Sequence, residues 1–286
     1  MIDSRMSLDS IVVVVALIAA LLSSSESAIA DDKATPLFDG RSLDGWDVIE
    51  RDRQWWTVAD GAITGGSLEQ KVPHNTFIST EESFQNFELT LKIRIQGTEG
   101  FINSGIQIRS IRVPNSSEMS GYQVDAGVGW WGKIYDESRR NKVVGEAADL
   151  EAVNRAVRKD DWNEYRIRAE GRRIRSWING VAALDYTEQD GNIPLDGHIG
   201  VQAHGGGKVL VQIKDIMIER LPPTADAMTW DKLQFKKGSG TVVQSTLRAV
   251  PATVPDPFLN RQAKPEQNDS GIRTPQEELC GFRVPD

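Results

Sequence analysis

The stretch from Phe87 to Ile95 alternates apolar with polar or charged side chains without exception. A period of two residues places the apolar set on one face of a β-strand, so this stretch predicts a strand that lies on a core. The same alternation recurs at residues 106–109, 122–126, 165–169, 174–178, 199–204 and 211–218. Its parity slips once, between Ile213 and Ile216, which predicts a β-bulge near Lys214-Asp215. A chain with this many half-buried strands is restricted to folds of packed sheets.

Turn signals separate these stretches, and only one segment has a helical pattern. Pairs such as Asp60-Gly61 and Asn179-Gly180 favour tight connections between antiparallel strands. Apolar residues recur at helical spacing only in the segment Ala147–Val157. No glycine-rich phosphate-binding loop follows a predicted strand, which argues against nucleotide binding. The sequence therefore predicts an all-β fold, a single jelly-roll β-sandwich over residues 35–221 with one short helix.

The first 30 residues differ from this body in composition. Arg5 precedes an apolar run from Ile11 to Leu22, and small residues follow up to Ala30, which is the order of a secretory signal peptide. The run is shorter than the about 20 apolar residues that a membrane-spanning helix needs. We therefore expect a cleaved signal peptide over residues 1–30 and a secreted or periplasmic protein. An uncleaved membrane anchor is the alternative.

Residues 222–286 are predicted to form an extended, proline-rich tail. They hold most of the chain's 12 prolines, together with polar, aperiodic stretches of the kind found in linkers. We expect Trp230 and Phe235 to pack the start of this tail against the body. The stretch Thr274–Leu279 resembles the lead-in to a haem-type dehydrogenase module of large bacterial proteins. The tail is therefore also expected to lead to a further module.

Charge and the scarcity of metal-ligating residues narrow the range of functions. The formal net charge is −8, which argues against a nucleic-acid partner because such proteins normally carry a basic face. The single cysteine, Cys280, excludes an intramolecular disulfide and any metal site built from cysteines. Three histidines, His74, His198 and His204, leave little room for a histidine-rich metal centre.

Short motifs occur in a fixed order along the predicted sandwich. They are Leu37-Phe38-Asp39-Gly40, Leu43-Asp44-Gly45-Trp46, Trp56–Gly61, Asn103-Ser104-Gly105-Ile106 with Arg109, Gly121-Tyr122-Gln123-Val124, Trp162–Tyr165, Trp177–Gly180 and Gln202–Gly205. This order resembles the 3-keto-disaccharide hydrolase family, formerly a domain of unknown function, over almost the whole body. The resemblance implies a concanavalin A-like sandwich and the cleavage of glycosides whose sugar is oxidised at carbon 3. One position departs from the family's pattern, because the residue after Tyr122 is often Glu there and is Gln123 here. Either Asp125 replaces that carboxylate, or activity is lost.

The reaction that this resemblance implies makes defined demands on a site. A ketone at carbon 3 acidifies the proton on carbon 2. A base removes that proton, the enolate expels the group on carbon 1, and water then adds across the new double bond. Such a site needs a positioned base, a donor to the enolate oxygen and an acid for the leaving group. It does not need the opposed carboxylate pair of ordinary glycosidases.

The polar positions of the alternating strands point to one face of the sheet. Six of the side chains predicted on that face are candidates for this site, namely Gln107, Arg109, Gln123, Asp125, Gln202 and His204. His204 is the first candidate base, because an imidazole titrates near neutrality; the alternative is a cap on a glycine-rich hairpin. Arg109 is a candidate clamp for the enolate oxygen, or else a salt-bridge partner of Asp125. Asp125 is a candidate base, a partner that orients His204 or, with His204 and Glu137, a ligand of a divalent metal. The three glutamines are candidates for substrate binding.

A second group of candidates follows directly in the sequence. The tandem tryptophans Trp130 and Trp131, ahead of Glu137, suit sugar recognition, and we expect at least one of the two rings in the core. Tyr135 is a candidate proton donor to the leaving oxygen, or else a buried anchor. Arg139-Arg140 with Glu137 is expected to form a solvated charge cluster. No ligand spacing demands a metal, so no cofactor is predicted outright, and a divalent metal stays open as an alternative.

Three functions remain open at this point. The first is an exported enzyme that cleaves 3-keto-glycosides by hydrolysis, or by elimination and hydration. The second is a non-catalytic carbohydrate-binding module on the same sandwich, which Gln123 favours. The third is an interaction domain of a larger redox protein, which rests on the tail alone. The expected partners are a carbohydrate and, for the enzyme, a sugar 3-oxidoreductase that supplies the ketone.

Overall fold

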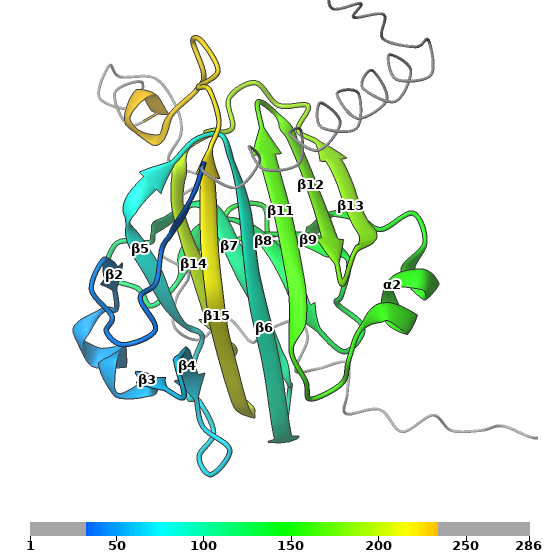
Figure 1. The fold of residues 1–286 in the computed structure, drawn as a ribbon. Coiled ribbons are helices and arrows are strands. Elements are labelled where there is room, and N and C mark those ends of the chain that lie inside the picture. The colour runs from blue at the N-terminus through cyan, green and yellow to red at the C-terminus, as the bar shows by residue number, and fades with distance from the viewer. Residues whose placement is uncertain (1–32, 234–286) are drawn as a thin grey trace, which may run out of the picture. The chain divides into compact units, whose positions relative to one another are not determined.

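The structure is a computed structural model that describes residues 33–233. These residues form two sheets packed face to face, and every strand pair in this part of the chain is antiparallel (Figure 1). Across sheet A the order is β13 (Val181–Thr187), β12 (Arg173–Ile178), β11 (Asn163–Glu170), β6 (Phe87–Glu99), β15 (Lys208–Arg220), β4 (Ala62–Gly66) and β3 (Trp56–Ala59), and β1 (Ala34–Pro36) also pairs with β15. Across sheet B it is β10 (Val143–Glu146), β9 (Lys133–Glu137), β8 (Met119–Gly127), β7 (Asn103–Arg112), β14 (Gly197–Ala203), β5 (Thr76–Phe84) and β2 (Trp46–Asp47).

Two short helices accompany the sheets. The 3-10 helix η1 (Glu50–Trp55) lies between β2 and β3 in the sequence. The α-helix α2 (Leu150–Ala156) lies inside the segment that was predicted to be helical, and the carboxylate of Asp149 caps it by accepting from the Ala152 N–H at 2.8 Å. Within residues 33–233, no helix is long and apolar enough to cross a membrane.

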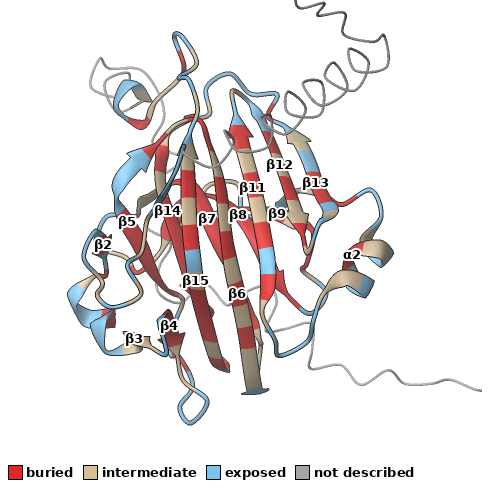
Figure 2. Ribbon diagram, in the orientation of Figure 1, coloured by how far each residue is buried: buried red, intermediate tan, exposed pale blue. Residues whose placement is uncertain are grey.

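The apolar parity of the strands builds the core between the sheets. Buried residues alternate with less buried ones along β6 and β11 (Figure 2). Leu89 of β6 and Ile106 of β7 are both fully buried in one apolar cluster that takes in side chains of both sheets. The prediction of an all-β sandwich is therefore confirmed. The predicted bulge is confirmed as well, because the register of β15 against β6 shifts between Lys214 and Met217.

The predictions for the two ends of the chain fall mostly outside the described residues. The expected signal peptide, Phe235 and the remainder of the tail all lie there. Trp230 is described, and the prediction that it packs on the body is confirmed. Its ring is 6% exposed, and its Nε1–H donates to the backbone carbonyl of Arg109 at 3.2 Å.

Arg109 does not lie on the polar face that the alternation predicted. The register between β7 and β8 shifts between Ile108 and Ile111, and Arg109 adopts a φ of 51° at this bulge. Its guanidinium donates to three oxygens in the turns that lead into β6 and β12, namely Gln85 O at 2.8 Å, Gly171 O at 2.7 Å and Asn86 Oδ1 at 3.0 Å. Burial lowers its pKa to about 10. The prediction that Arg109 points to the outer face is wrong. Its side chain instead ties sheet B to two turns of sheet A.

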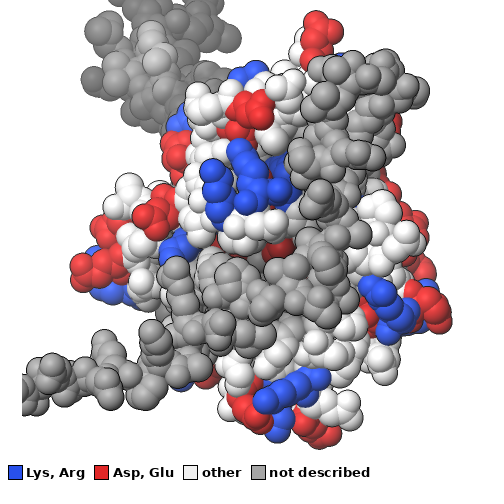
Figure 3. All heavy atoms as spheres, turned by 180° about the vertical axis from the view of Figure 1, so that it is seen from behind, with Lys and Arg blue, Asp and Glu red and all other residues white. Residues whose placement is uncertain are grey.

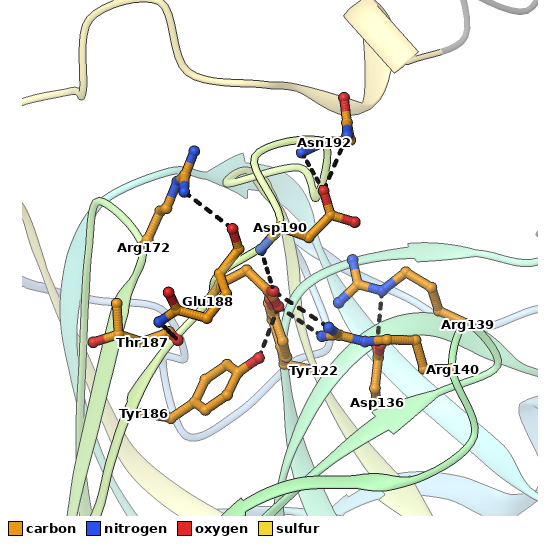
Figure 4. Close-up of polar contacts among 11 residues, drawn as sticks. Tyr122, Asp136, Arg139, Arg140, Arg172, Tyr186, Thr187, Glu188, Asp190 and Asn192 are labelled. Atoms are coloured by element: carbon orange, nitrogen blue, oxygen red, sulfur yellow. Dashed lines mark hydrogen bonds and ion pairs between the residues drawn. The ribbon is translucent and has the colours of Figure 1, made fainter.

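A buried charge network closes the same end of the sandwich (Figure 4). Glu188 follows β13 of sheet A and accepts from Tyr122 Oη of β8 at 2.5 Å and from Arg140 Nη2 at 2.7 Å. Asp136 of β9 pairs with both Arg139 and Arg140, whose side chains are 4% and 26% exposed. The expectation of a solvated charge cluster is therefore wrong. Burial raises the pKa of Glu188, but hydrogen bonds from Arg140 and Tyr122 outweigh it and hold that pKa at about 2.

We expect Arg109→Met to lower the free energy of unfolding by about 3 kcal/mol, because it leaves two buried carbonyls and an amide oxygen without their charged donor. Urea unfolding of the purified protein measures the change. Arg41→Met, at an exposed position, is the matched control and should unfold as the wild type does. An Arg109 variant as stable as this control would contradict the structural role.

We expect Glu188→Gln to cost about 2 to 3 kcal/mol of stability at pH 7 and progressively less at acid pH. The folded pKa of about 2 lies below the ordinary value of 4.5, so the stabilisation is complete above pH 4.5 and is lost as the pH falls towards 2. Thermal unfolding between pH 2 and pH 7 should show the two curves converging. Glu151→Gln, on the exposed face of α2, supplies the control. A gap that stays constant with pH would refute this account.

Candidate functional site

Four of the predicted site residues form a hydrogen-bonded row on the outer face of sheet B. In the ladder of β7 and β8, Gln107 lies opposite Gln123 and Gly105 lies opposite Asp125. The Nε2 of Gln107 donates to Gln123 Oε1 at 3.0 Å. The Nε2 of Gln123 donates to Asp125 Oδ1 at 3.0 Å and to Gln202 Oε1, on β14, at 3.4 Å. The alternation along the strands thus places the three predicted amide side chains and the predicted carboxyl side by side on one face.

The row is buried and leaves two polar atoms without partners. All four side chains are at most 3% exposed. Asp125 Oδ2 and Gln202 Nε2 make no hydrogen bond within residues 33–233. Burial raises the pKa of Asp125 well above its usual range. The hydrogen bond from Gln123 lowers that pKa, but by less than burial raises it. The face therefore carries a carboxyl oxygen and an amide N–H that are available to hydrogen-bond a ligand.

His204 stands at one end of this row, two residues beyond Gln202. Its Nδ1 lies 2.7 Å from the carbonyl oxygen of Gly205. A carbonyl oxygen only accepts, so Nδ1 carries a proton. The ring packs edge-on against Phe101, with 4.6 Å between centroids.

Aromatic rings continue from His204 along the same end of sheet B. Phe101 packs edge-on against Trp130 at 6.4 Å, and Trp130 packs against Tyr135 at 6.3 Å. Tyr135 lies opposite Gln123 in the ladder of β8 and β9, and Glu137 lies opposite Gly121, so both share the outer face. Such rings beside polar groups suit the apolar faces and hydroxyls of a sugar.

Two other predicted site residues lie elsewhere. Trp131 is 8% exposed and stacks on Tyr165 in the core, with 6.0 Å between ring centroids, so it is the tandem ring that faces inward. The guanidinium of Arg109 hydrogen-bonds to the turns before β6 and β12, as described above. Figure 3 shows the molecule from the side of sheet B, where basic side chains gather on the surface.

Sequence reasoning missed Arg112. The bulge at Arg109 reverses the parity of β7, so that Arg112 shares the outer face. Its Nη2 donates to the carbonyls of Phe77 and Asp47, both at 2.9 Å, while Nε and Nη1 are buried without a hydrogen-bond partner among residues 33–233. Only a correct placement of the bulge would have revealed it.

A second pair that the sequence did not suggest joins His74 and Asp52. The Nε2 of His74 lies 2.8 Å from Asp52 Oδ1, although the two residues are 22 positions apart. Among residues 33–233, no three histidine, cysteine, aspartate or glutamate side chains are arranged to hold a metal ion.

Comparison with known proteins adds a family and several structures of similar fold. The model of the 3-keto-α-glucoside-1,2-lyase-like domain matches residues 33–219. A candidate glycosyl hydrolase from Parabacteroides distasonis is 20% identical, with a TM-score of 0.48, and the match covers 66% of this chain and 94% of that one.

Two Bacillus subtilis structures also match. The carbohydrate-binding module CBM66 is 16% identical at a TM-score of 0.44, covering 61% of this chain and 95% of the module. A protein of unknown function with a galectin-like fold is 10% identical at a TM-score of 0.49, covering 67% and 96%. No curated protein sequence matches the chain.

The family match agrees with the resemblance that the motifs indicated. It spans every strand from β1 to β14 and nearly all of β15, and it includes the row of polar side chains on sheet B as well as His204. The chain therefore belongs to the 3-keto-α-glucoside-1,2-lyase-like domain family.

Proposed function

We propose that this protein cleaves 3-keto-glycosides by elimination across carbons 1 and 2, followed by hydration of the product. The observation that carries the proposal is the buried polar row in which Gln123 bonds to Gln107, Asp125 and Gln202, with His204 two residues beyond Gln202. Membership of the family supports a carbohydrate as the ligand. The reaction needs a base and a donor to an oxyanion, and this face offers one of each.

In the first step, His204 Nε2 takes the proton from carbon 2. The electrons of the broken C–H bond form a double bond between carbons 2 and 3, and the ketone oxygen becomes an enolate oxygen. Asp125 Oδ2 and Gln202 Nε2 are the donors that stabilise this oxygen. A neutral carboxylic acid in a buried site gives a strong hydrogen bond to a developing oxyanion without opposing its charge.

In the second step, the enolate collapses. The ketone reforms, a double bond forms between carbons 1 and 2, and the bond from carbon 1 to the leaving oxygen breaks. The leaving oxygen takes up one proton. Water then adds its hydroxyl to carbon 1 and a proton to carbon 2, which gives the free 3-keto sugar. The substrate already carries a ketone at carbon 3, so a sugar 3-oxidoreductase must act before this enzyme.

We assign substrate binding to the outer face of sheet B. We assign Trp130 to contact with the sugar ring, and Gln107, Gln123 and Glu137 to its hydroxyls. We also propose that the protein is exported, on the basis of the apolar run and small residues before Ala30.

A non-catalytic carbohydrate-binding module is the second candidate. Gln123 favours it, because the family often carries a carboxylate at that position. The two candidates differ in what they require of His204, since a module needs binding from this face and a catalyst needs proton transfer.

We expect the purified protein to release sugar from a 3-keto-disaccharide, and His204→Ala to lower the rate about 10²- to 10⁴-fold while the sugar still binds. Chromatography of the products, with and without a chelator, measures turnover, and calorimetry measures binding. His198→Gln, which changes a histidine within β14, is the matched control and should keep full activity. Binding without product from several 3-keto-disaccharides would establish the module and refute the enzyme.

A further inference from the structure

The His74–Asp52 pair has the form of an oriented proton-transfer group. Asp52, in η1, is fully buried, and its Oδ1 lies 2.8 Å from His74 Nε2. Its other oxygen, Oδ2, is buried and makes no hydrogen bond within the described part of the chain. The side chain of His74 is 43% exposed, so the imidazole joins a buried carboxylate to solvent. A carboxylate that holds one ring nitrogen fixes the direction in which the other nitrogen points.

This pair lies beside the proposed catalytic base. A Cβ on Gly205 would fall 2.6 Å from the Cα of His74, so the backbone at His74 runs directly against the residue that follows His204. The Oδ1 of Asn75 accepts from the Gly205 N–H at 3.0 Å, which holds the two segments together. The backbone of His74 therefore lies against the residue next to His204 in the chain, at one end of sheet B.

We propose that His74, oriented by Asp52, donates the proton that the leaving oxygen takes up when the bond to carbon 1 breaks. This inference rests on the proposed function and adds the acid that the elimination lacks. Asp52 holds Nε2 of the imidazole, and the proton that passes to the leaving oxygen is carried by the other ring nitrogen. When the C–O bond breaks, its electron pair stays on the oxygen, which takes the proton from His74. His204 meanwhile holds the proton from carbon 2, so the two histidines carry one proton each in opposite directions.

A purely structural pair would anchor η1 against the segment before β5. The two roles differ in how the effect of a substitution depends on the leaving group. An acid matters greatly for a poor leaving group, such as an alkyl alcohol, and little for 4-nitrophenol, which departs as the anion. Loss of an anchor would affect both substrates alike.

The test compares a methyl and a 4-nitrophenyl 3-keto-glucoside, with rates corrected for the uncatalysed reaction. We expect His74→Gln and Asp52→Asn to lower kcat on the methyl glycoside by about 100-fold and on the nitrophenyl glycoside by less than about 5-fold. His204→Ala should lose both activities. Glu50→Gln removes an exposed carboxylate from the same 3-10 helix, and this control should match the wild type. Circular dichroism verifies that each variant is folded.

A second measurement separates the two histidines even if Asp52→Asn does not fold. His74→Gln in D₂O should still exchange the proton on carbon 2 of the unreacted substrate, because the base is intact, and His204→Ala should not. Equal losses on the two substrates, or none, with an active wild type would overturn the role of His74 and leave the proposed function standing. So would finding the leaving-group dependence in Tyr135→Phe instead. A wild type that cleaves neither glycoside would overturn both.

Discussion

The apolar layer between the two sheets decides what the outer face of sheet B can carry. Side chains alternate along a strand, so the burial of Ile106 and Val124 in that layer sends Gln107, Gln123 and Asp125 to the opposite face. Adjacent registers then set these groups side by side, where they bond to one another. Among residues 33–233, Asp125 Oδ2 and Gln202 Nε2 are left without hydrogen-bond partners, and a ligand that bonds to them would offset that cost.

Charged side chains fix the other end of the same strands. Arg109 ties β7 to the turns that precede β6 and β12, and Glu188 ties the end of β13 to Tyr122 of β8. These contacts join the two sheets at the end away from His204. The structural contacts therefore lie at one end of β7 and β8. Gln107, Gln123 and Asp125 of the proposed site lie on these two strands, which are fixed at the end away from His204. Rigid strands position reacting groups better than loops do.

Period-two alternation was sufficient to predict the sandwich and the row of Gln107, Gln123, Asp125 and Gln202, because parity is a local property of the sequence. It failed at Arg109, where a bulge reverses parity and no sequence signal marks the reversal, and Arg112 was missed for the same reason. The pairing of His74 with Asp52 could not be foreseen, since it depends on how η1 packs beside β5. The contrast between Trp130 and Trp131 was foreseen only in part, because neighbouring residues point in opposite directions but nothing local says which points inward.

Gln123 stands where the family often carries a glutamate, and the structure gives a physical reason for the difference. A glutamate there would put a second carboxyl within 3.0 Å of Asp125, where the two groups would compete for one proton. Gln123 instead donates to Asp125 and leaves it the single carboxyl of the row. An elimination through an enolate builds negative charge on the substrate, so a neutral acid serves it better than a pair of carboxylates does. In the proposed mechanism the carboxyl of the row is that of Asp125, two positions further along β8, and the proton transfers are assigned to His204 and His74.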